Sequence, residues 1–334
     1  MRLGKSGNSV NWKQNRVLVT GATGIVGSWL VKRLLQEGAC VITLILDWDP
    51  QSELIRSGDI YRTTVVNGRL EEYCTLERAI STHDVDTVFH LGAQAIVVNA
   101  LRSPLLTFET NIRGTYNLLE ACRVHSGLVK RVVVASSDKA YGAVEKLPYT
   151  EEMLPNGRHP YDVSKSCADM IATAYAHTYN LPVTVARCGN IYGGGDLNWS
   201  RIVPGTIRSA LNDEKPVLRS DGRCTRDYIF VLDAVNAYLL LASKTSADGI
   251  CGDAFNFSPE RQVSVLEITN MLLELMDRRD LEPIILNQAP AEIQDQYLDS
   301  TKAKRLLNWK PQYQLEQGLV ETINWYKHFF NGYS

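Results

Sequence analysis

Several features that would assign this sequence to a specialised class of protein are absent from its 334 residues. The seven cysteines are scattered, odd in number and never form a C-x-x-C pair, which argues against a disulfide framework. Neither the cysteines nor the six dispersed histidines have the spacing of metal ligands, so we expect no metal site. The longest apolar runs are far shorter than the roughly 20 residues that a membrane-spanning helix needs.

Charge and composition narrow the class further. The formal net charge of -2 leaves no concentrated basic face, so we expect neither nucleic acid nor an anionic membrane as a partner. The stretch MRLGKSGNSVNWKQN is polar and lacks the apolar core of a secretory signal, which together with the unpaired cysteines favours a cytoplasmic location. With 45% hydrophobic and 22% charged residues, the chain can bury a sizeable core in one large domain or two modest ones.

The order of apolar and amphipathic segments predicts an α/β protein. Strand-like runs lie at residues 16–20, 41–46, 63–66, 87–91, 131–135 and 182–188, and helix-like stretches lie at 28–36, 76–80, 107–124 and 161–179. This alternation is typical of a Rossmann-type, doubly wound parallel sheet with helices on both faces. After Asn190 the rhythm breaks at Gly193-Gly194-Gly195-Asp196, and prolines punctuate the rest, which indicates a smaller C-terminal α/β lobe.

These patterns suggest how the chain is divided. We expect residues 12–188 to form a Rossmann domain that binds a dinucleotide, and residues 227–258 to return to it with a short strand at 227–231 in its sheet. Residues 189–226 and 259–330 would then form the smaller substrate-binding lobe.

A glycine-rich turn follows the first predicted strand, in the sequence VLVTGATGIVGSWL. Gly21 permits a tight turn, Gly24 lets the backbone approach a pyrophosphate, and Gly27 lets helix and strand pack closely. The helix start also presents free N–H groups and the positive end of its dipole to phosphate. Such a turn can be a mere connection, but a buried strand before it and an amphipathic helix after it favour a dinucleotide site. The turn residues Thr23, Ile25 and Val26 would belong to that site.

The second predicted strand bears on which dinucleotide is bound. In this kind of fold an acidic residue at the end of that strand accepts hydrogen bonds from the adenosine ribose. The usual position falls at Ile45, and the acid that is present, Asp47, comes two residues later; it is either the ribose ligand or a solvated loop carboxylate. No Arg or Lys between Cys40 and Pro50 is available for a 2′-phosphate, so NAD is favoured over NADP.

A tyrosine and a lysine stand four residues apart at the start of the helix predicted over 161–179. Residues at this spacing share one helix face, so Tyr161 and Lys165 can point into one site. Lowering a tyrosine pKa from about 10 to 7 costs about 4 kcal/mol, and one charge at about 4 Å supplies that amount at an effective dielectric constant near 20. We therefore expect Lys165 to make Tyr161 a base at neutral pH, although the spacing alone also occurs by chance.

Three polar residues follow the strand predicted over 131–135. The carboxyl end of a parallel strand is where ligands bind in this architecture. Ser137 can orient a substrate hydroxyl beside Tyr161, and Asp138 and Lys139 can serve as an acid and a base, although in most proteins such a pair is a solvated turn.

Taken together, the glycine turn, Ser137, Tyr161, Lys165 and Arg226-Asp227-Tyr228 resemble the extended short-chain dehydrogenase/reductase (NAD-dependent epimerase/dehydratase) family. The resemblance covers nearly the whole chain. Within the family the CDP-glucose 4,6-dehydratase group is the most similar. The segments that carry this second likeness are Trp12, Gly27-Ser28-Trp29-Leu30, Ser137-Asp138-Lys139, Gly189-Asn190, Gly193-Gly194-Gly195-Asp196, Arg201-Ile202-Val203-Pro204 and Leu306-Leu307-Asn308-Trp309-Lys310-Pro311.

The resemblance implies a dehydratase acting on a nucleoside-diphosphate hexose of the CDP-glucose or GDP-mannose type. Tyr161 would take the proton of the sugar 4-hydroxyl while the C4 hydride moves to NAD. Asp138 and Lys139 would then expel the C6 hydroxyl as water, with Asp138 favoured as the acid, and the hydride would return to C6. The product is a 4-keto-6-deoxy sugar.

The resemblance also assigns contacts residue by residue. Gln94, Asn190 and Ser137 match positions that contact the sugar. Arg226 and Arg201 match positions that contact the diphosphate. Paired guanidinium N–H donors are suited to phosphate oxygens. Leu91, Ala93, Tyr161 and Lys165 match cofactor contacts. Arg69 and Leu70 stand where the family usually has an acid and an apolar residue beside adenine, and the role of this departure is open. The family likeness further implies a homodimer formed through helices such as 107–124 and 161–179.

Two other functions are compatible with part of the pattern. A 4-epimerase of the same fold needs Tyr161 and the cofactor but no acid/base pair for elimination, so Asp138 and Lys139 count against it. A non-catalytic, NAD-sensing protein needs no tyrosine paired with a lysine, so the complete triad counts against that alternative.

Overall fold

The structure is a computed structural model that describes residues 10–247, 249–288 and 293–332. Most of the polar N-terminal stretch, residues 1–9, lies outside the described residues.

A parallel sheet forms the centre of the larger part of the molecule. Its strand order is β10-β6-β5-β4-β1-β2-β3, and every neighbouring pair is parallel. The strands are β1 Arg16–Thr20, β2 Cys40–Ile45, β3 Thr64–Asn67, β4 Thr87–His90, β5 Arg131–Ser137, β6 Val183–Cys188 and β10 Ala254–Phe257. The chain order reverses between β1 and β4, which makes their carboxyl ends the switch point where such sheets bind ligands. The predicted doubly wound fold is confirmed.

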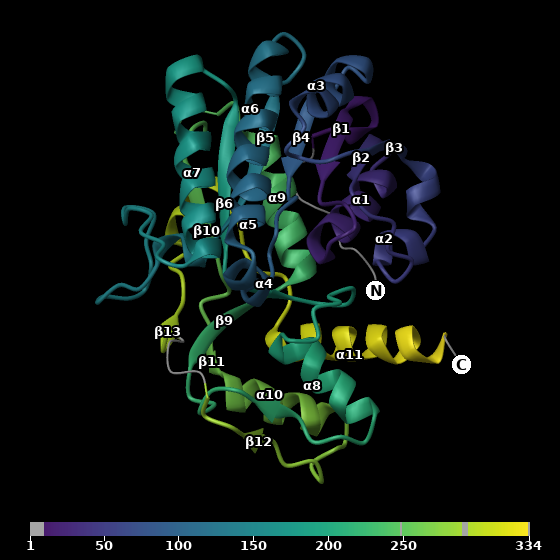
Figure 1. Ribbon diagram of the computed structural model, residues 1–334, viewed down its shortest axis with the longest axis vertical. Helices are drawn as coiled ribbons and strands as arrows, with labels where there is room; N and C mark the ends of the chain where they lie inside the picture. The colour runs from purple at the N-terminus through teal and green to yellow at the C-terminus, as the bar shows by residue number, and fades with distance from the viewer. Residues whose placement is uncertain (1–9, 248, 289–292, 333–334) are drawn as a thin grey trace.

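Helices cover both faces of this sheet (Figure 1). Helices α1 Ile25–Gln36 and α9 Val231–Lys244 contact each other on one face, and α3 Tyr73–Thr82, α6 Gly114–Val124 and α7 Pro160–Tyr179 adjoin one another on the other. Successive residues of β1 point to opposite faces of the sheet. Val17 and Val19 pack in the hydrophobic cluster beside α1 and α9, and Leu18 packs in the cluster beside α3 and α6. The sheet is therefore buried on both faces.

The helix predicted over 107–124 is not a single regular helix. It consists of α5 Pro104–Phe108, a π-helical turn η3 Glu109–Arg113, and α6. A π-turn inserts an extra residue into the helical repeat, and an apolar periodicity does not reveal such an insertion. The remaining short elements beside the sheet are η1 Trp12–Gln14, α2 Glu53–Arg56, η2 Asp59–Arg62, α4 Val97–Arg102, η4 Asp138–Tyr141 and η5 Ala303–Leu307.

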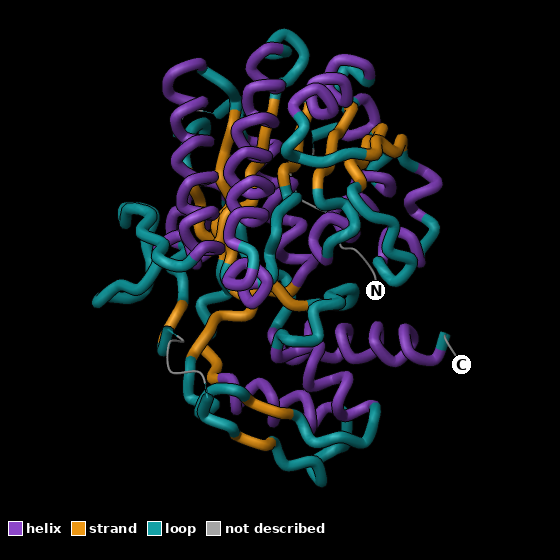
Figure 2. Tube along the Cα trace, viewed as in Figure 1, coloured by secondary structure: helices purple, strands orange, loops and turns teal. Residues whose placement is uncertain are grey.

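A smaller lobe lies below the carboxyl ends of the large sheet (Figures 1 and 2). Its small sheet joins β7 Asn190–Tyr192, β9 Thr225–Phe230, β11 Gln262–Ser264 and β13 Asp295–Gln296. Helices α8 Ile202–Leu211, α10 Val265–Leu275 and α11 Leu315–Asn331, with the strand pair β8 Val217–Leu218 and β12 Ile284–Ile285, complete it.

The strand expected at 227–231 is one point of difference. We expected it in the large sheet, but β9 pairs only with strands of the small sheet, and α9 and β10 are the elements that return to the large one. Its apolar end, Tyr228-Ile229-Phe230, is buried in either sheet, so burial alone does not distinguish the two positions. The expected domain boundaries themselves stay a prediction.

Two tryptophans, one buried and one half-buried, tie the two parts together. The Trp29 indole of α1 donates a hydrogen bond to the Gly194 carbonyl at 2.8 Å, and the Trp325 indole of α11 donates to Glu53 Oε2 at 2.8 Å. All seven cysteines are free. Among the described residues, no helix has both the length and the apolar character required to cross a bilayer.

Candidate active site

The glycine turn lies at the switch point of the large sheet. Gly21 follows β1 with a φ of 66°, and a Cβ there would come within 2.6 Å of the Gly92 nitrogen after β4. Gly27, in the first turn of α1, faces the Gly21 carbonyl so closely that a Cβ would lie 2.1 Å from its oxygen. The N-cap residue of α1, Gly24, supplies no side-chain cap, and no acidic residue stands in the first turn. The start of α1 thus keeps the backbone donors that a pyrophosphate requires.

The residues expected around adenosine lie at the ends of the next two strands. Asp47 is exposed in the loop two residues after β2, and Arg69 is exposed after β3. Leu70 is buried in the core, where its side chain adjoins Gly92 and Gly114. The Gly68 N–H donates to the Ile45 carbonyl at 3.1 Å, which holds the ends of β2 and β3 together.

Tyr161 begins the catalytic face of α7 and makes a hydrogen bond with Ser137 at the end of β5. Burial raises the pKa of its phenol to about 12, and the negative charges of Asp138 and Asp162 also raise it. The positive charge of Arg201 and the Ser137 hydrogen bond lower it. Our expectation of a phenol pKa near 7 is therefore wrong for this structure, because desolvation outweighs the nearby cations.

Lys165 is turned toward the sheet. Its ammonium donates a hydrogen bond to the Ala135 carbonyl of β5 at 2.8 Å, and burial lowers its pKa to about 8, against the opposing effect of Asp169. The charge that lowers the pKa of Tyr161 most is that of Arg201, on the smaller lobe, rather than that of Lys165. The spacing of Tyr161 and Lys165 predicted their common helix but not the partner that the ammonium takes.

The predicted acid and base stand at the start of η4. Asp138 is 2% exposed; its Oδ1 accepts the Ser137 hydroxyl at 2.8 Å, and its Oδ2 has no hydrogen-bond partner within the described part of the chain. Lys139 is half-buried, and its ammonium bonds with Oε1 of Gln296 on β13. The Lys139 side chain thus connects the end of β5 to the smaller lobe.

A second buried carboxyl group lies near Asp138. Asp227 on β9 is fully buried, accepts the Leu298 N–H at 3.0 Å through Oδ2, and sits so close under Gly189 that a Cβ there would be 2.2 Å from Oδ1. Burial and the charge of Asp138 raise the pKa of Asp227 to about 7, although the Ser258 hydroxyl lowers it. In the sequence, Asp227 stands out only as part of the motif Arg226-Asp227-Tyr228. Its closeness to Asp138 arises from two strands of different sheets.

Asn111 is a site residue that the sequence did not reveal. From η3 its Oδ1 accepts the Gln94 N–H at 2.7 Å, and its Nδ2 donates to the Gln94 carbonyl at 3.1 Å and to Ser164 Oγ at 2.9 Å. Ser164 in turn donates to the Tyr161 carbonyl at 2.7 Å. The side chain therefore joins the loop after β4 to the turn of α7 between Tyr161 and Lys165. Buried polar residues in a predicted apolar helix are the signal that would have indicated it.

A buried histidine supports the floor of the site. His90, the last residue of β4, bonds to the Thr20 hydroxyl at 2.8 Å and to the Thr115 hydroxyl at 3.0 Å. Burial, with the charge of Lys165, lowers its pKa to about 3, so it is neutral at physiological pH. Its role is to fix the ends of β1 and β4 against α6.

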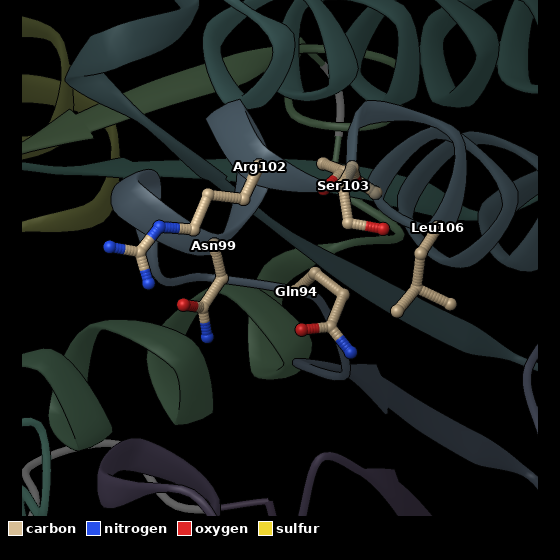
Figure 3. A pocket seen from close by; sticks show the side chains of 6 residues that line it. Gln94, Asn99, Arg102, Ser103 and Leu106 are labelled. Carbon is tan, nitrogen blue, oxygen red and sulfur yellow. Dashed lines mark hydrogen bonds between the residues drawn. The ribbon is translucent and has the colours of Figure 1, made fainter.

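Gln94 faces a cavity of about 260 Å³ beside the turn after β4 (Figure 3). The other residues lining it, from α4, α5 and the residue between them, are Asn99, Arg102, Ser103, Leu106 and Thr107. Leu91 and Ala93 precede Gln94 and are half-buried at the end of β4. The backbone of Gln94 is fixed by Asn111, and its side chain is left to face this space.

The predicted diphosphate ligands come from the smaller lobe. Arg201, at the N-cap of α8, bonds to Asp196 Oδ2 at 3.1 Å and acts electrostatically on Tyr161. Arg226 is 4% exposed, and its guanidinium donates to the carbonyls of Thr225, Ile293 and Gln294 at 2.7, 2.7 and 3.0 Å. Asn190 starts β7, half-buried. Arg201 thus lies close enough to Tyr161 to act on its charge, whereas Arg226 is engaged by backbone carbonyls.

Among the described residues, no group of three or more His, Cys, Asp or Glu side chains is arranged to hold a metal ion.

Sheet order, glycine turn and Ser/Tyr/Lys constellation together define an extended short-chain dehydrogenase/reductase. The chain belongs to the GDP-mannose 4,6 dehydratase family, whose sequence model matches residues 18–322.

Three comparisons describe its relatives. A CDP-glucose 4,6-dehydratase of Salmonella typhimurium is 30% identical over 96% of this chain and 93% of its own length. A dTDP-glucose 4,6-dehydratase of Streptomyces venezuelae, solved with NAD and TYD bound, superposes with a TM-score of 0.85 at 26% identity, covering 94% and 97% of the two chains. A UDP-glucose 4-epimerase of Thermotoga maritima, solved with UDP-glucose, superposes with a TM-score of 0.85 at 30% identity, covering 94% and 99%.

Proposed function

We propose that this protein is a nucleotide-sugar 4,6-dehydratase that converts a nucleoside-diphosphate hexose, of the CDP-glucose or GDP-mannose type, to the 4-keto-6-deoxy sugar. The observation that carries the proposal is the placement of Asp138 and Lys139 directly after Ser137, with Ser137 bonded to both Asp138 and Tyr161. A 4-epimerase needs the tyrosine and serine but has no use for an acid and a base that expel water.

NAD is the proposed cofactor. The crowding of Gly21 and Gly27 and the uncapped start of α1 fit a pyrophosphate, with Thr23, Ile25 and Val26 in the same turn. Asp47 would hold the ribose, Leu70 and Arg69 would lie toward adenine, and Leu91 and Ala93 would line the path to Tyr161 and Lys165. When bound, NAD supplies the hydride acceptor that oxidises C4 and later reduces C6.

Side chains of this protein would accept and donate the protons of the reaction. Tyr161 takes the proton of the 4-hydroxyl in its ionised form, which Arg201 and the Ser137 hydroxyl favour and burial disfavours. The resulting 4-keto group acidifies C5–H, Lys139 takes the C5 proton, and Asp138 protonates the departing C6 hydroxyl. Gln94 and Asn190 would contact the sugar, and Arg201 and Arg226 the diphosphate. For Arg226 this requires that its guanidinium exchange backbone carbonyls for phosphate oxygens.

The assay that tests this proposal is incubation of the purified protein with CDP-glucose, GDP-mannose, UDP-glucose and dTDP-glucose, followed by mass spectrometry. We expect one of them to yield a product lighter by one water. An isomer of unchanged mass would instead identify a 4-epimerase, which the T. maritima relative makes the second candidate. Absence of turnover with all four would contradict both and favour a protein that only binds the dinucleotide.

A homodimer is the proposed assembly. Helices α6 and α7 adjoin, and each carries exposed apolar side chains: Tyr116 and Val124 on α6, and Met170 and Tyr179 on α7. A second copy that covers both helices would bury this surface.

A further inference from the structure

The proposed dehydratase function, on which this inference rests, requires a proton for the departing C6 hydroxyl. Each turnover consumes one proton at the departing C6 hydroxyl and releases one from the 4-hydroxyl. Asp138, the proposed donor, is 2% exposed, so bulk water has little access to its carboxyl group. The proton that it donates must therefore reach it through the protein.

The hydrogen bonds of Ser137 provide the path. Its hydroxyl donates to Asp138 Oδ1 at 2.8 Å, and the same side chain is hydrogen-bonded to Tyr161. A serine hydroxyl has one proton and two acceptor lone pairs. The bond with Ser137 lowers the pKa of Tyr161, so the serine can donate to the ionised phenol. Once Tyr161 has taken a proton, its phenol can donate to a free lone pair of Ser137 Oγ, while the Ser137 proton is directed to Asp138. Ser137 Oγ also accepts the Lys139 N–H at 3.3 Å, which fixes the hydroxyl between the two groups.

We propose that Ser137 relays the proton that Tyr161 takes from the substrate 4-hydroxyl to Asp138, which delivers it to the leaving C6 hydroxyl. The O4–H bond breaks and the phenol O–H forms; the phenol proton then moves to Ser137 Oγ as the Ser137 proton moves to Asp138 Oδ1. Asp138 protonates O6 while the C6–O6 bond breaks, so water leaves and Tyr161 and Asp138 are both ionised again. The C5 proton goes to Lys139 and returns to C5. The hydride removed from C4 returns at C6 through NAD, so the cycle exchanges no net proton with solvent.

The test separates oxidation at C4 from loss of water. A single turnover is quenched with borodeuteride, which labels C4 of every 4-keto sugar, and mass spectrometry gives the ratio of labelled hexose, which retains its 6-hydroxyl, to labelled 6-deoxyhexose. Ser137→Ala should raise this ratio at least 10-fold, because the ketone forms but Asp138 is not reprotonated, and we expect the same of Asp138→Asn. Ser137→Thr, which keeps the hydroxyl, should restore the wild-type ratio.

A matched control is available on the same strand. Ser136 is buried and its hydroxyl has no partner in the described structure, so Ser136→Ala removes a serine hydroxyl outside the relay and should leave the ratio unchanged. A slower Ser137→Ala enzyme with the wild-type ratio would overturn the relay and leave the dehydratase function intact. Failure of the wild-type protein to form any 4-keto sugar would overturn the proposed function, and the relay with it.

A second measurement needs no variant. In mixtures of light and heavy water, transfer of several protons in one step makes the single-turnover rate of 6-deoxy sugar formation curve with the deuterium fraction. We expect a curved dependence in the wild-type enzyme, because the relay moves protons at Tyr161, Ser137 and Asp138 together. A straight line would show a single moving proton and would overturn the relay.

Discussion

At the scale of the single residue, Tyr161 is the group on which the proposed chemistry depends. Replacement of Tyr161 by Phe removes the hydroxyl and leaves a ring of the same shape. We expect C4 oxidation, followed by the absorbance of the reduced nicotinamide, to fall by about 100-fold or more, the usual contribution of a general base. Cofactor content and melting temperature should be unchanged. Tyr179→Phe, at the exposed end of the same helix, is the control; near-normal oxidation in Tyr161→Phe would remove this residue from the mechanism.

The carboxyl group of Asp227 gives a prediction about pH and stability. Its pKa is raised from 3.8 to about 7 in the folded protein, so the folded chain holds a proton between about pH 4 and 7 that the unfolded chain has released. Stability from this group is therefore present in acid and is lost as the pH rises through 7, by about 4 kcal/mol at most for a shift of three units.

Replacement of Asp227 by Asn abolishes this dependence while the side-chain oxygen can still accept the Leu298 N–H. Urea unfolding at pH 5 and pH 8 should show the free energy of unfolding of wild type falling relative to Asp227→Asn as the pH rises. A difference between the two proteins that is the same at both pH values would contradict the raised pKa.

Residues differ in how far the sequence reveals their position. Ser137 and Gly21 follow apolar runs, and the carboxyl ends of parallel strands meet at one edge, so their convergence could be predicted. Asp227 and Asn111 reach the site from a strand of the small sheet and from a π-turn, and no periodicity indicates either. The pKa of Tyr161 was predicted in the wrong direction because the balance of burial against charge depends on three-dimensional packing.

At the scale of the element, the start of α1 packs closely against the turn that follows β1. A Cβ on Gly27 would lie 2.1 Å from the Gly21 oxygen, so α1 must move away from the turn to accept it. We expect Gly27→Ala to lower the free energy of unfolding by about 1–3 kcal/mol, the usual cost of overpacking, and to weaken NAD binding. Denaturant unfolding and calorimetric titration with NAD measure the two effects. Gly127→Ala, where a Cβ meets nothing within 4 Å, should change neither; equal stability of both variants would show that the turn can relax.

At the scale of the whole molecule, the apolar surface of α6 and α7 governs assembly. Met170 is 52% exposed on α7, and Met170→Glu would place a charge within the proposed contact. Light scattering after size-exclusion chromatography should show wild type at twice the chain mass and the variant at the chain mass of 37.4 kDa. Val217→Glu alters an equally exposed apolar residue, 52%, on the smaller lobe and should leave the mass unchanged. A wild-type protein already at the chain mass would contradict the dimer.

The tryptophan contacts between the two parts of the molecule also bear on the order of events during synthesis. Helix α1 is made early, yet one partner of Trp29 is the Gly194 carbonyl, and Trp325 packs over that glycine from the last helix. A nascent chain can pair its first strands while still attached to the ribosome. The Gly194 turn that Trp29 contacts stays incompletely covered until α11 has been made, so chaperones that recognise exposed apolar surface have their longest opportunity there.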